Sequence, residues 1–566
     1  MRVPSRTLAL AFLLCMTACS PMWGGPTAPA ASPVASSGPA TPTPFQPAED
    51  TRTPTPSLTE TPSGLTLTRQ ATTLWVSPAA PDVLHQFALI SGLPLAATSD
   101  TAGARLGVIQ PQPASPGPQD SLWIYALVAP FPTIPDGVAF TELQSAWKGI
   151  PAGPFSGRPL WMAGSTLAAF SDLWGAPAPG AVSVVSADQL VDSAWANRPA
   201  WGIVPFEALE PRWKVLSVDD QSPIHNDFNP SAYPLKIAFD LQPLLFPLLP
   251  TNRYPYRLTV LAMTGTTALV RGTEDKMVKN GVLYPGEDIR SVLRSADLTH
   301  VSNEVSFDPN CPTPDPYTSS LQFCSNPADI ALLDDMGVDI VELTGNHLKD
   351  YGAADLLSTI DMYDQRGWLH YGGGRNLADA LTPAKVTNND NKLAFVGCNI
   401  VGPPNDWATD STPGSAPCNL DQMAAEISQL RASGYLPIMT FQYDEYYQST
   451  PTDYEQRDFR RMADAGAVIV SGSQAHMPAT MELDNGSFIH YGLGNLFFDQ
   501  MSHLMPDGSL IYDTRNEFVD RHVFYEGRYI STELLTFLLE DFSRPRPMTT
   551  PERTRFLQAI FTAAGW

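Results

Sequence analysis

Four apolar runs in the second half of the chain each end in a cluster of polar residues, and this recurrence constrains the fold more than any other feature. The runs read LTVLAM, VDIVEL, LPIMTF and AVIVSG. The polar clusters that follow them are Thr264–Thr267, Asn346–His347, Gln442–Glu445 and Ser473–His476. In open α/β sheets, functional loops gather beyond the carboxyl ends of the strands. The pattern therefore predicts one polar site at that edge of a sheet.

Helical patterns such as AADLLSTIDMYDQRG separate the strand-like runs. This alternation predicts an α/β (α+β) fold in which helices cover a parallel or mixed sheet. A chain of 566 residues is too long for one core, so we expect two or more domains. The expected segments are a signal peptide over 1–19, a Pro/Ser/Thr-rich tether over 20–64, a smaller α/β accessory domain over 65–243, a linker over 244–255, the main domain over 256–540 and a C-terminal tail over 541–566.

The N-terminus carries the features of an export signal. Arg2 and Arg6 form a basic start before the apolar stretch Leu8–Leu14, which is too short to span a bilayer as a mature helix. The Met-Thr-Ala-Cys sequence that ends at Cys19 resembles a bacterial lipobox, although Met16 stands where Leu is usual. We expect a membrane lipid on Cys19 and a lipoprotein at the extracytoplasmic face of the cell membrane. Ordinary secretory cleavage, with Cys19 incidental, is the alternative.

Export would place the other cysteines in an oxidising compartment, where disulfides form. Four cysteines follow Cys19, and four cysteines allow three connectivities. Proximity in the sequence favours Cys311–Cys324 and Cys398–Cys418. A zinc site is the competing interpretation, but the chain has no C-x-x-C pair.

The charge balance excludes one class of partner. The chain has 34 basic and 58 acidic residues and a net charge of -24. Proteins that bind the phosphate backbone need clustered Lys and Arg, so we expect no nucleic acid partner.

The motifs of the second half resemble the capsule-synthesis CapA family, also called PgsA-like poly-γ-glutamate synthesis proteins, which carry a calcineurin-like metallophosphatase fold. The resemblance covers about Tyr256–Asp499. The segment Gly265–Arg271 stands where the family has Gly-Asp-x-x-x-x-Arg, and LTGNHLKDYG (Leu343–Gly352) stands where it has Asn-Asn-His-x-x-Asp-x-Gly. SGSQAHMP (Ser471–Pro478) and HYGLGNLFFD (His490–Asp499) stand where it has Gly-x-His-x-His and Tyr-Ser-Leu-Gly-Asn.

The resemblance extends to SADLTHVSNE, where Ser302, Asn303 and Glu304 stand in place of the family's Asn-Leu-Glu, and it implies roles for several residues. Glu304, Asn346 and His476 would be metal ligands, since oxygen and nitrogen ligands suit Mn, Fe or Zn. His347 would act as an acid or a phosphate contact, and Asp350 would orient its ring. The residues expected to contact a substrate are Arg271, Gln442, Glu445, Gln474 and Asn495.

The chain departs from the family at three of these positions. Thr266 stands where a bridging aspartate is expected, and Gln442 and Gln474 stand where histidines are expected. Two divalent ions about 4 Å apart repel by roughly 16 kcal/mol at an effective dielectric constant of about 20, and a bridging carboxylate normally offsets much of this repulsion. We therefore expect one divalent metal or none.

Each candidate also has a purely structural interpretation. His347 could cap the following helix, Glu304 could be a solvated loop carboxylate, and His476 could donate a structural hydrogen bond. Residues 65–243 resemble lobes of bacterial extracellular solute-binding proteins in their texture, and a generic α/β accessory domain is the alternative.

These observations predict an exported CapA-like protein that takes part in synthesis or processing of capsule or poly-γ-glutamate. Its expected partners are an anionic surface polymer or the machinery that assembles it. If the protein is an enzyme, the reaction would be hydrolysis or transfer at a phosphoryl or amide centre. The alternative is a surface lipoprotein whose cleft binds a ligand or partner without catalysis.

Overall fold

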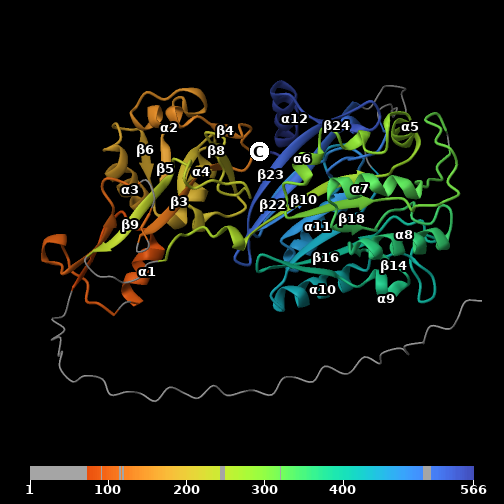
Figure 1. Cartoon of the computed structure of the whole chain (residues 1–566), viewed down its shortest axis with the longest axis horizontal. Coiled ribbons are helices and arrows are strands. Elements are labelled where there is room, and N and C mark those ends of the chain that lie inside the picture. Colours follow the sequence, from red (N-terminus) through yellow and green to blue (C-terminus); the bar gives the residue numbers. More distant parts are fainter. Residues whose placement is uncertain are drawn as a thin grey trace, which may run out of the picture. The chain divides into compact units, whose positions relative to one another are not determined.

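The structure of the protein is a computed structural model that describes residues 73–90, 92–113, 116–117, 120–242, 249–318, 320–445, 447–500 and 512–566 (Figure 1). The expected signal peptide, Cys19 and the tether lie outside the described residues. Residues Arg69–Trp566 belong to one compact unit.

The N-terminal part, which comprises the described residues from 73 to 242, is built on a nine-stranded sheet. Its strands are β1 (Leu74–Val76), β2 (Ala104–Val108), β3 (Ser121–Pro130), β4 (Gly137–Val138), β5 (Leu160–Met162), β6 (Val182–Val184), β7 (Trp201–Pro205), β8 (Trp213–Val218) and β9 (Lys236–Gln242). The main order is β1-β2-β9-β3-β7-β5-β6, and β8 pairs with both β3 and β4. The helices are α1 (Asp82–Ile90), α2 (Phe140–Trp147), α3 (Gly164–Trp174) and α4 (Leu190–Ala196).

The C-terminal part, which comprises the described residues from 249 to 566, contains two larger sheets. The seven-stranded sheet consists of β13 (Leu369–Tyr371), β12 (Ile340–Glu342), β11 (Leu298–Asn303), β10 (Leu258–Thr267), β22 (Asn516–Tyr525), β23 (Arg528–Glu540) and β24 (Arg544–Pro547), in this order. The six-stranded sheet consists of β15 (Ala384–Asn388), β16 (Asn391–Asn399), β18 (Leu436–Gln442), β19 (Ile469–Ser473), β21 (Ser487–His490) and β20 (Met481–Asp484). The short strands β14 (Gly373–Gly374) and β17 (Gly414–Ser415) pair with each other.

These two sheets pack face to face. His300 of β11 stacks on Phe395 of β16 with ring centroids 6.0 Å apart, and Phe488 of β21 meets His522 of β22 at 5.7 Å. Buried apolar residues from both sheets form one continuous core between them.

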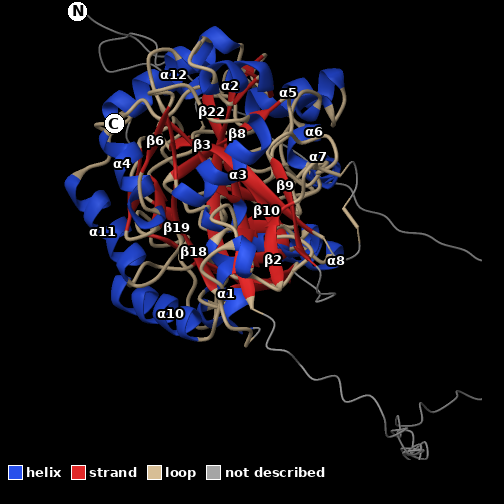
Figure 2. Ribbon diagram, turned by 90° about the vertical axis from the view of Figure 1, so that its left-hand side faces the viewer, coloured by secondary structure: helices blue, strands red, loops and turns tan. Residues whose placement is uncertain are grey.

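Helices cover the outer faces of the two sheets (Figure 2). The helices on these faces are α5 (Arg271–Asn280), α6 (Arg290–Leu293), α7 (Ile330–Met336), α8 (Ala353–Arg366), α9 (Leu377–Ala380), α10 (Leu420–Ala432) and α11 (Asp453–Asp464). The last helix, α12 (Thr550–Ala563), instead contributes Leu557, Ile560 and Phe561 to the core between the sheets. A core cluster joins α5–α8 to the seven-stranded sheet, and another joins α10 and α11 to the six-stranded sheet. The α/β class and the layered sheets expected from the sequence are thus confirmed. Residues 541–566, which we expected to be a tail, form β24 and α12.

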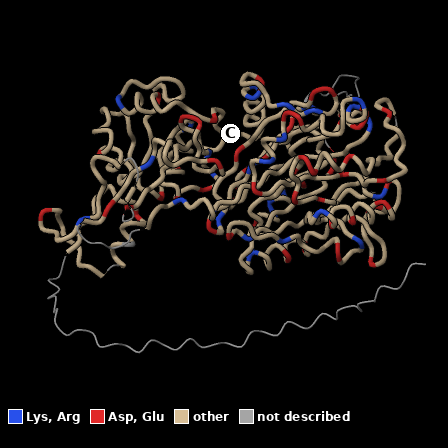
Figure 3. Tube along the Cα trace, viewed as in Figure 1, with Lys and Arg blue, Asp and Glu red and all other residues tan. Residues whose placement is uncertain are grey.

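Both expected disulfides are confirmed: Cys311 is bonded to Cys324, and Cys398 to Cys418. Such bonds are typical of proteins outside the cytoplasm. None of the helices in the described ranges has the length and apolar character needed to cross a bilayer. In the described part of the trace, Lys and Arg lie scattered among Asp and Glu and do not gather in one stripe (Figure 3).

Candidate functional site

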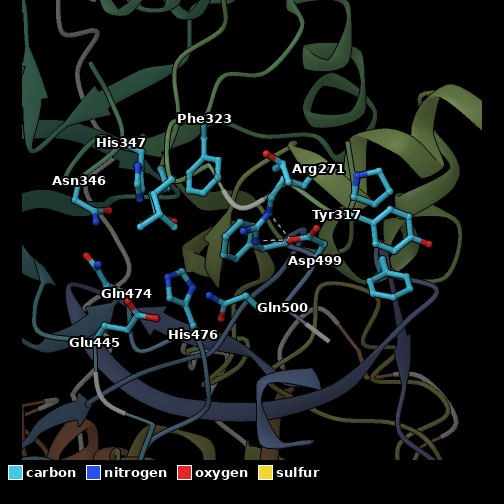
Figure 4. Close-up of a pocket in the computed structure, with 16 residues that line it drawn as sticks. Arg271, Tyr317, Phe323, Asn346, His347, Glu445, Gln474, His476, Asp499 and Gln500 are labelled. Atoms are coloured by element: carbon cyan, nitrogen blue, oxygen red, sulfur yellow. Dashed lines mark hydrogen bonds and ion pairs between the residues drawn. The ribbon is translucent and has the colours of Figure 1, made fainter. Parts of the chain in front are cut away.

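A cavity of about 580 Å³ opens at the carboxyl ends of β10, β18 and β19. Most of the predicted site residues line it: Arg271, Glu304, Asn346, His347, Glu445, Gln474 and His476. Figure 4 shows Phe323 between His347 and Arg271, with Gln474 and His476 across the cavity from His347. Parallel strands bring these residues together because their carboxyl ends meet at one edge of a sheet.

Two glycines allow the backbone to close around this site. A Cβ atom on Gly345 would lie 2.7 Å from the Cα atom of Glu304, and one on Gly265 would lie 2.1 Å from the carbonyl oxygen of Gly494. Real Cβ atoms do not approach so closely, so both positions require glycine. The loops that carry Glu304 and Asn346 are therefore held against each other by backbone contact.

His347 and Asp350 form a hydrogen-bonded pair at the wall of the cavity. Nδ1 of His347 lies 2.7 Å from Oδ2 of Asp350, which also accepts a hydrogen bond from the backbone N–H of Phe323 at 2.8 Å. Burial lowers the pKa of His347, but the hydrogen bond to Asp350 and the charges of Glu304, Asp350 and Asp406 outweigh burial and raise the pKa above its usual value. His347 therefore retains a proton to a higher pH than a free histidine. The helix-cap interpretation is wrong, because α8 begins at Ala353 with Gly352 at its N-cap.

Asp406 is a buried carboxyl that acts on His347 through its charge. Burial and the charge of Asp350 raise the pKa of Asp406 to about 6, against the opposing effects of Lys349 and His347. No motif in the sequence indicated a role for this residue.

Arg271 is held by Asp499 and by two aromatic rings. Its Nε and Nη2 atoms donate to Oδ1 of Asp499 at 3.0 and 2.5 Å, and its guanidinium lies 4.9 Å from the ring centroids of both Phe323 and Phe498. The ion pair is largely buried. Arg271 is thus fixed as a planar cation at one wall of the cavity.

The positions that depart from the family form a network of amide groups. Nε2 of Gln442 donates to Oδ1 of Asn346 at 3.1 Å and to Oε1 of Glu304 at 3.3 Å, and it also contacts Oε1 of Gln474. Oε1 of Gln442 lies 2.8 Å from the hydroxyl of Ser473, from which it accepts a hydrogen bond. An uncharged N–H donor therefore points at the oxygen atoms that the resemblance assigns to a metal ion.

Glu304 is only 2% exposed, so the solvated-loop interpretation is wrong. A second carboxyl, Glu342, is joined to the amide network through Ser473. It accepts hydrogen bonds from Thr344 at 2.5 Å and from Ser473 at 3.2 Å. Burial raises the pKa of Glu342, and the surrounding hydroxyl groups oppose this shift.

His476 is hydrogen-bonded to Asn495 in the turn that follows β21. Its Nδ1 atom lies 2.8 Å from Oδ1 of Asn495, whose Nδ2 atom donates to the carbonyl oxygen of His476 at 3.1 Å. The structural hydrogen bond considered for His476 is therefore present. Asn495 is fully buried and does not line the cavity.

The backbone of the site is strained at two places, the segment between β19 and β20 and the first residue of α5. Gln474 and His476 adopt φ angles of 75° and 52°, and Arg271 adopts 46°. Left-handed backbone at residues other than glycine costs roughly 1–3 kcal/mol and clusters at functional sites. Thr266 lies at the same place, where its Oγ1 atom accepts from the backbone N–H of Gln474 at 3.4 Å.

The side chains do not fit the two-ion centre that the resemblance implies. Among the described residues, no three His, Cys, Asp or Glu side chains are grouped so that they could hold a metal ion. Within the described part of the chain, Glu304 is the only carboxylate to which Gln442 donates, and Gln442 directs its N–H groups at the expected ligand oxygens. Hydrogen-bond donors at these oxygens compete with a cation, and one negative charge does little to offset two divalent ions.

Comparison with known proteins shows what the C-terminal part of the chain is similar to. Residues 260–500 match the family model described as "Bacterial capsule synthesis protein PGA_cap". This segment is CapA-like. The chain is 26% identical over 228 residues to "PGA biosynthesis protein CapA" of Bacillus subtilis (strain 168) and 27% identical over 179 residues to "Capsule biosynthesis protein CapA" of Bacillus anthracis. These matches cover 39% and 31% of this chain and 59% and 44% of the two relatives, so the chain spans about half the length of the proteins it matches.

Solved structures resemble the chain only weakly. The NAD nucleotidase NadN of Haemophilus influenzae aligns over 54% of this chain and 56% of its own, with 10% identity and a TM-score of 0.29. An ABC-type phosphate transport receptor from Vibrio cholerae covers 30% of this chain and 85% of its own, with 13% identity and a TM-score of 0.24. At these scores neither match carries an argument.

Proposed function

We propose that this protein takes part in the assembly or processing of an anionic, amide-linked surface polymer such as poly-γ-glutamate, and that its cleft binds a segment of the polymer without a two-metal centre. The names of the CapA relatives support the process. The orientation of the Gln442 amide, with its N–H groups directed at Glu304, Asn346 and Gln474, supports binding in place of metal-dependent hydrolysis.

The cleft offers partners for both the backbone amides and the carboxylates of such a polymer. The amide side chains of Asn346 and Gln474 can exchange hydrogen bonds with backbone amides of the polymer. Arg271 and protonated His347 can neutralise its carboxylates, because charge-assisted hydrogen bonds to such groups are the stronger ones. The aromatic ring of Tyr317, which is 92% exposed, lines the mouth and offers apolar contact.

Export and anchoring complete the proposal. We infer that Cys19 carries the lipid that holds the protein at the extracytoplasmic face of the cell membrane, where such a polymer would be assembled. The two disulfides support an oxidising location. In a Cys19→Ala variant, the protein should move from the membrane fraction to a soluble fraction.

The test is direct binding of a poly-γ-glutamate oligomer to the purified full chain at pH 6, measured by calorimetry with EDTA present. We expect binding to survive EDTA and to weaken about tenfold in Gln474→Ala, since loss of one hydrogen bond to a charged or polar ligand costs on the order of 1.4 kcal/mol. Gln422→Ala is the matched control, because Gln422 is exposed on α10 and is not among the residues that line the cavity. Binding that appears only after addition of Mn, Fe or Zn would reject the proposal.

The His347–Asp350 pair favours one second candidate, hydrolysis or transfer at an amide or phosphoryl centre with His347 as the acid. The same samples decide between the two. Cleavage of the oligomer that is lost in His347→Ala would establish catalysis, whereas binding without cleavage supports the binding cleft.

A further inference from the structure

We propose that the N-terminal part binds a free α-amino acid, or another small molecule with both a carboxylate and an ammonium group, in a second cavity beside Tyr125. This cavity has a volume of about 280 Å³. Its walls include Asp82, Tyr125, Ser165, Thr166, Asp188 and Glu207. Pockets for drug-sized ligands measure roughly 300–1,000 Å³, so this cavity suits a smaller molecule. The proposal does not depend on the function proposed for the CapA-like cleft.

The first turn of α3 offers donors for a carboxylate. Ala163 is the N-cap of this eleven-residue helix and makes no side-chain hydrogen bond to the first turn. The first N–H groups of a helix have no partner within the helix, and its N-terminus carries a partial positive charge. Ala163, Ser165 and Thr166 all line the cavity, so this end of the helix faces it.

The buried hydroxyl group of Tyr125 lacks a hydrogen-bond partner among the described residues, which is an independent indication of a ligand. Its side chain is 1% exposed and lines the cavity from the central strand β3. Its hydroxyl group has no hydrogen-bond partner among the described residues. Buried hydroxyl groups are nearly always hydrogen-bonded, so a polar ligand atom is the expected partner.

The charges around the cavity select an ammonium group and disfavour a simple dianion. Among the described residues that line the cavity, Arg212 alone is basic, and it donates to Asp192 and Glu210 at 2.5 Å each. Asp82 and Asp188 are exposed at the cavity and form no ion pair within the described part of the chain.

Glu207 is the carboxyl that the structure holds most firmly at this cavity. Its oxygens accept hydrogen bonds from Nε1 of Trp123 at 3.0 Å and Nδ2 of Asn252 at 2.6 Å. A molecule with its carboxylate at α3 and its ammonium at these acidic groups satisfies both ends of the cavity. A phosphate would meet the helix end but face the acidic side chains.

The test is calorimetry on the purified full chain with L-alanine, L-glutamine, sodium acetate, methylamine and inorganic phosphate as probes. We expect at least one amino acid to bind, and acetate, methylamine and phosphate to bind at least tenfold more weakly. Tyr125→Phe should weaken the amino acid about tenfold, since it removes one hydrogen bond. Asp82→Asn should weaken the amino acid and leave acetate unchanged.

Tyr256→Phe and Asp172→Asn are the matched controls, because both residues are exposed and absent from the cavity lining. Saturation of the protein with poly-γ-glutamate should not alter the amino acid isotherm, which separates this site from the CapA-like cleft. Phosphate that binds more tightly than both amino acids would overturn the proposal. An amino acid affinity that Tyr125→Phe leaves unchanged would also overturn it. So would the absence of binding when each amino acid is present at about 10 mM, a concentration that detects even weak affinities.

Discussion

The Nδ1 atom of His347 lies 2.7 Å from Oδ2 of Asp350, and both side chains are less than one-fifth exposed. The carboxylate also accepts a hydrogen bond from the backbone N–H of Phe323, which lies in a loop segment outside any strand or helix. The protonation of His347 therefore depends on Asp350 and on the loop that carries Phe323.

Substitution Asp350→Asn should lower the pKa of His347 and destabilise the protein more at low pH than at high pH. The pKa of His347 is raised in the folded state, so its stabilising contribution is fully present below the ordinary histidine pKa of about 6.5 and is lost as the pH rises through the folded value. We expect a loss of about 1–2 kcal/mol at pH 5.5 and a smaller loss at pH 8.5. Urea unfolding at the two pH values measures this difference.

The exposed Asp410→Asn variant is the control, because Asp410 makes no ion pair within the described residues. Equal losses for Asp350→Asn at both pH values would show that the carboxylate acts only through packing. An NMR titration of the His347 ring then reports the pKa directly.

Removal of the Cys311–Cys324 disulfide should disturb the cavity as well as the stability. Phe323, the neighbour of Cys324, contacts the ring of His347 at a centroid distance of 4.6 Å and lies beside Arg271. In the chain-entropy model, a loop of this length contributes about 3 kcal/mol. We expect Cys311→Ser/Cys324→Ser to lose about this amount and to shift the pKa of His347.

The Cys398→Ser/Cys418→Ser double variant is a matched control, since this second disulfide closes a loop of similar length. It should cost a similar free energy of unfolding and shift the pKa of His347 less, because its loop reaches the ring only through the charge of Asp406, whereas Phe323 contacts the ring directly. A His347 titration that moves equally in both double variants would refute the link through Phe323.

The strands and helices that could be predicted are those with strong local patterns. LTVLAM, LPIMTF and AVIVSG became the buried strands β10, β18 and β19, and AADLLSTIDMYDQR became α8. The strand β11 was missed because THVSN is polar, and these side chains are buried by pairing with β10 and β12. Pairing between distant segments cannot be seen in the local pattern of one strand.

The same limit applies to the site. The polar clusters after strands located Asn346, His347 and Gln474, because such residues share one edge of the sheet, and the family resemblance located Glu304. Phe323, Asp406 and Glu342 were missed, since their roles depend on loops and strands that meet only in the folded chain. Asp499 was part of a recognised motif, but its pairing with Arg271 across 228 residues had no local signal.

Lys214 should make stability rise with pH between about 8 and 10. Burial lowers the pKa of Lys214 to about 8, although Asp136 opposes this shift, whereas the unfolded chain has the ordinary value near 10.4. Between these values the unfolded state binds more protons, so deprotonation favours the folded state. We expect a gain on the order of 1–2 kcal/mol from pH 7.5 to pH 9.5, measured by urea unfolding.

Lys214→Met should flatten this dependence, while the exposed Lys392→Met should retain it. The opposite outcome is a wild-type stability that falls from pH 7.5 to pH 9.5 while the stability of Lys214→Met stays constant. It would show that Asp136, whose Oδ1 atom lies 2.8 Å from Nζ of Lys214, keeps the ammonium charged.

Substitution Gln442→Glu tests whether an amide N–H replaces a cation in the cleft. The change removes the donor that faces Glu304 and Asn346 and brings a second carboxylate next to Glu304. Two buried carboxylates without a counter-charge repel, so we expect a loss of about 2–4 kcal/mol at pH 8. Because protonation of either carboxyl relieves the repulsion, the loss should shrink at pH 5.

Added Mn²⁺ should also restore the melting temperature of the Gln442→Glu variant, since a cation can take the place of the lost donor. Mn²⁺ should have a much smaller effect on the melting temperature of the wild type. Gln422→Glu on the exposed face of α10 controls for the added charge. If elemental analysis finds two tightly bound metal ions in the wild type, the donor role assigned to Gln442 is wrong.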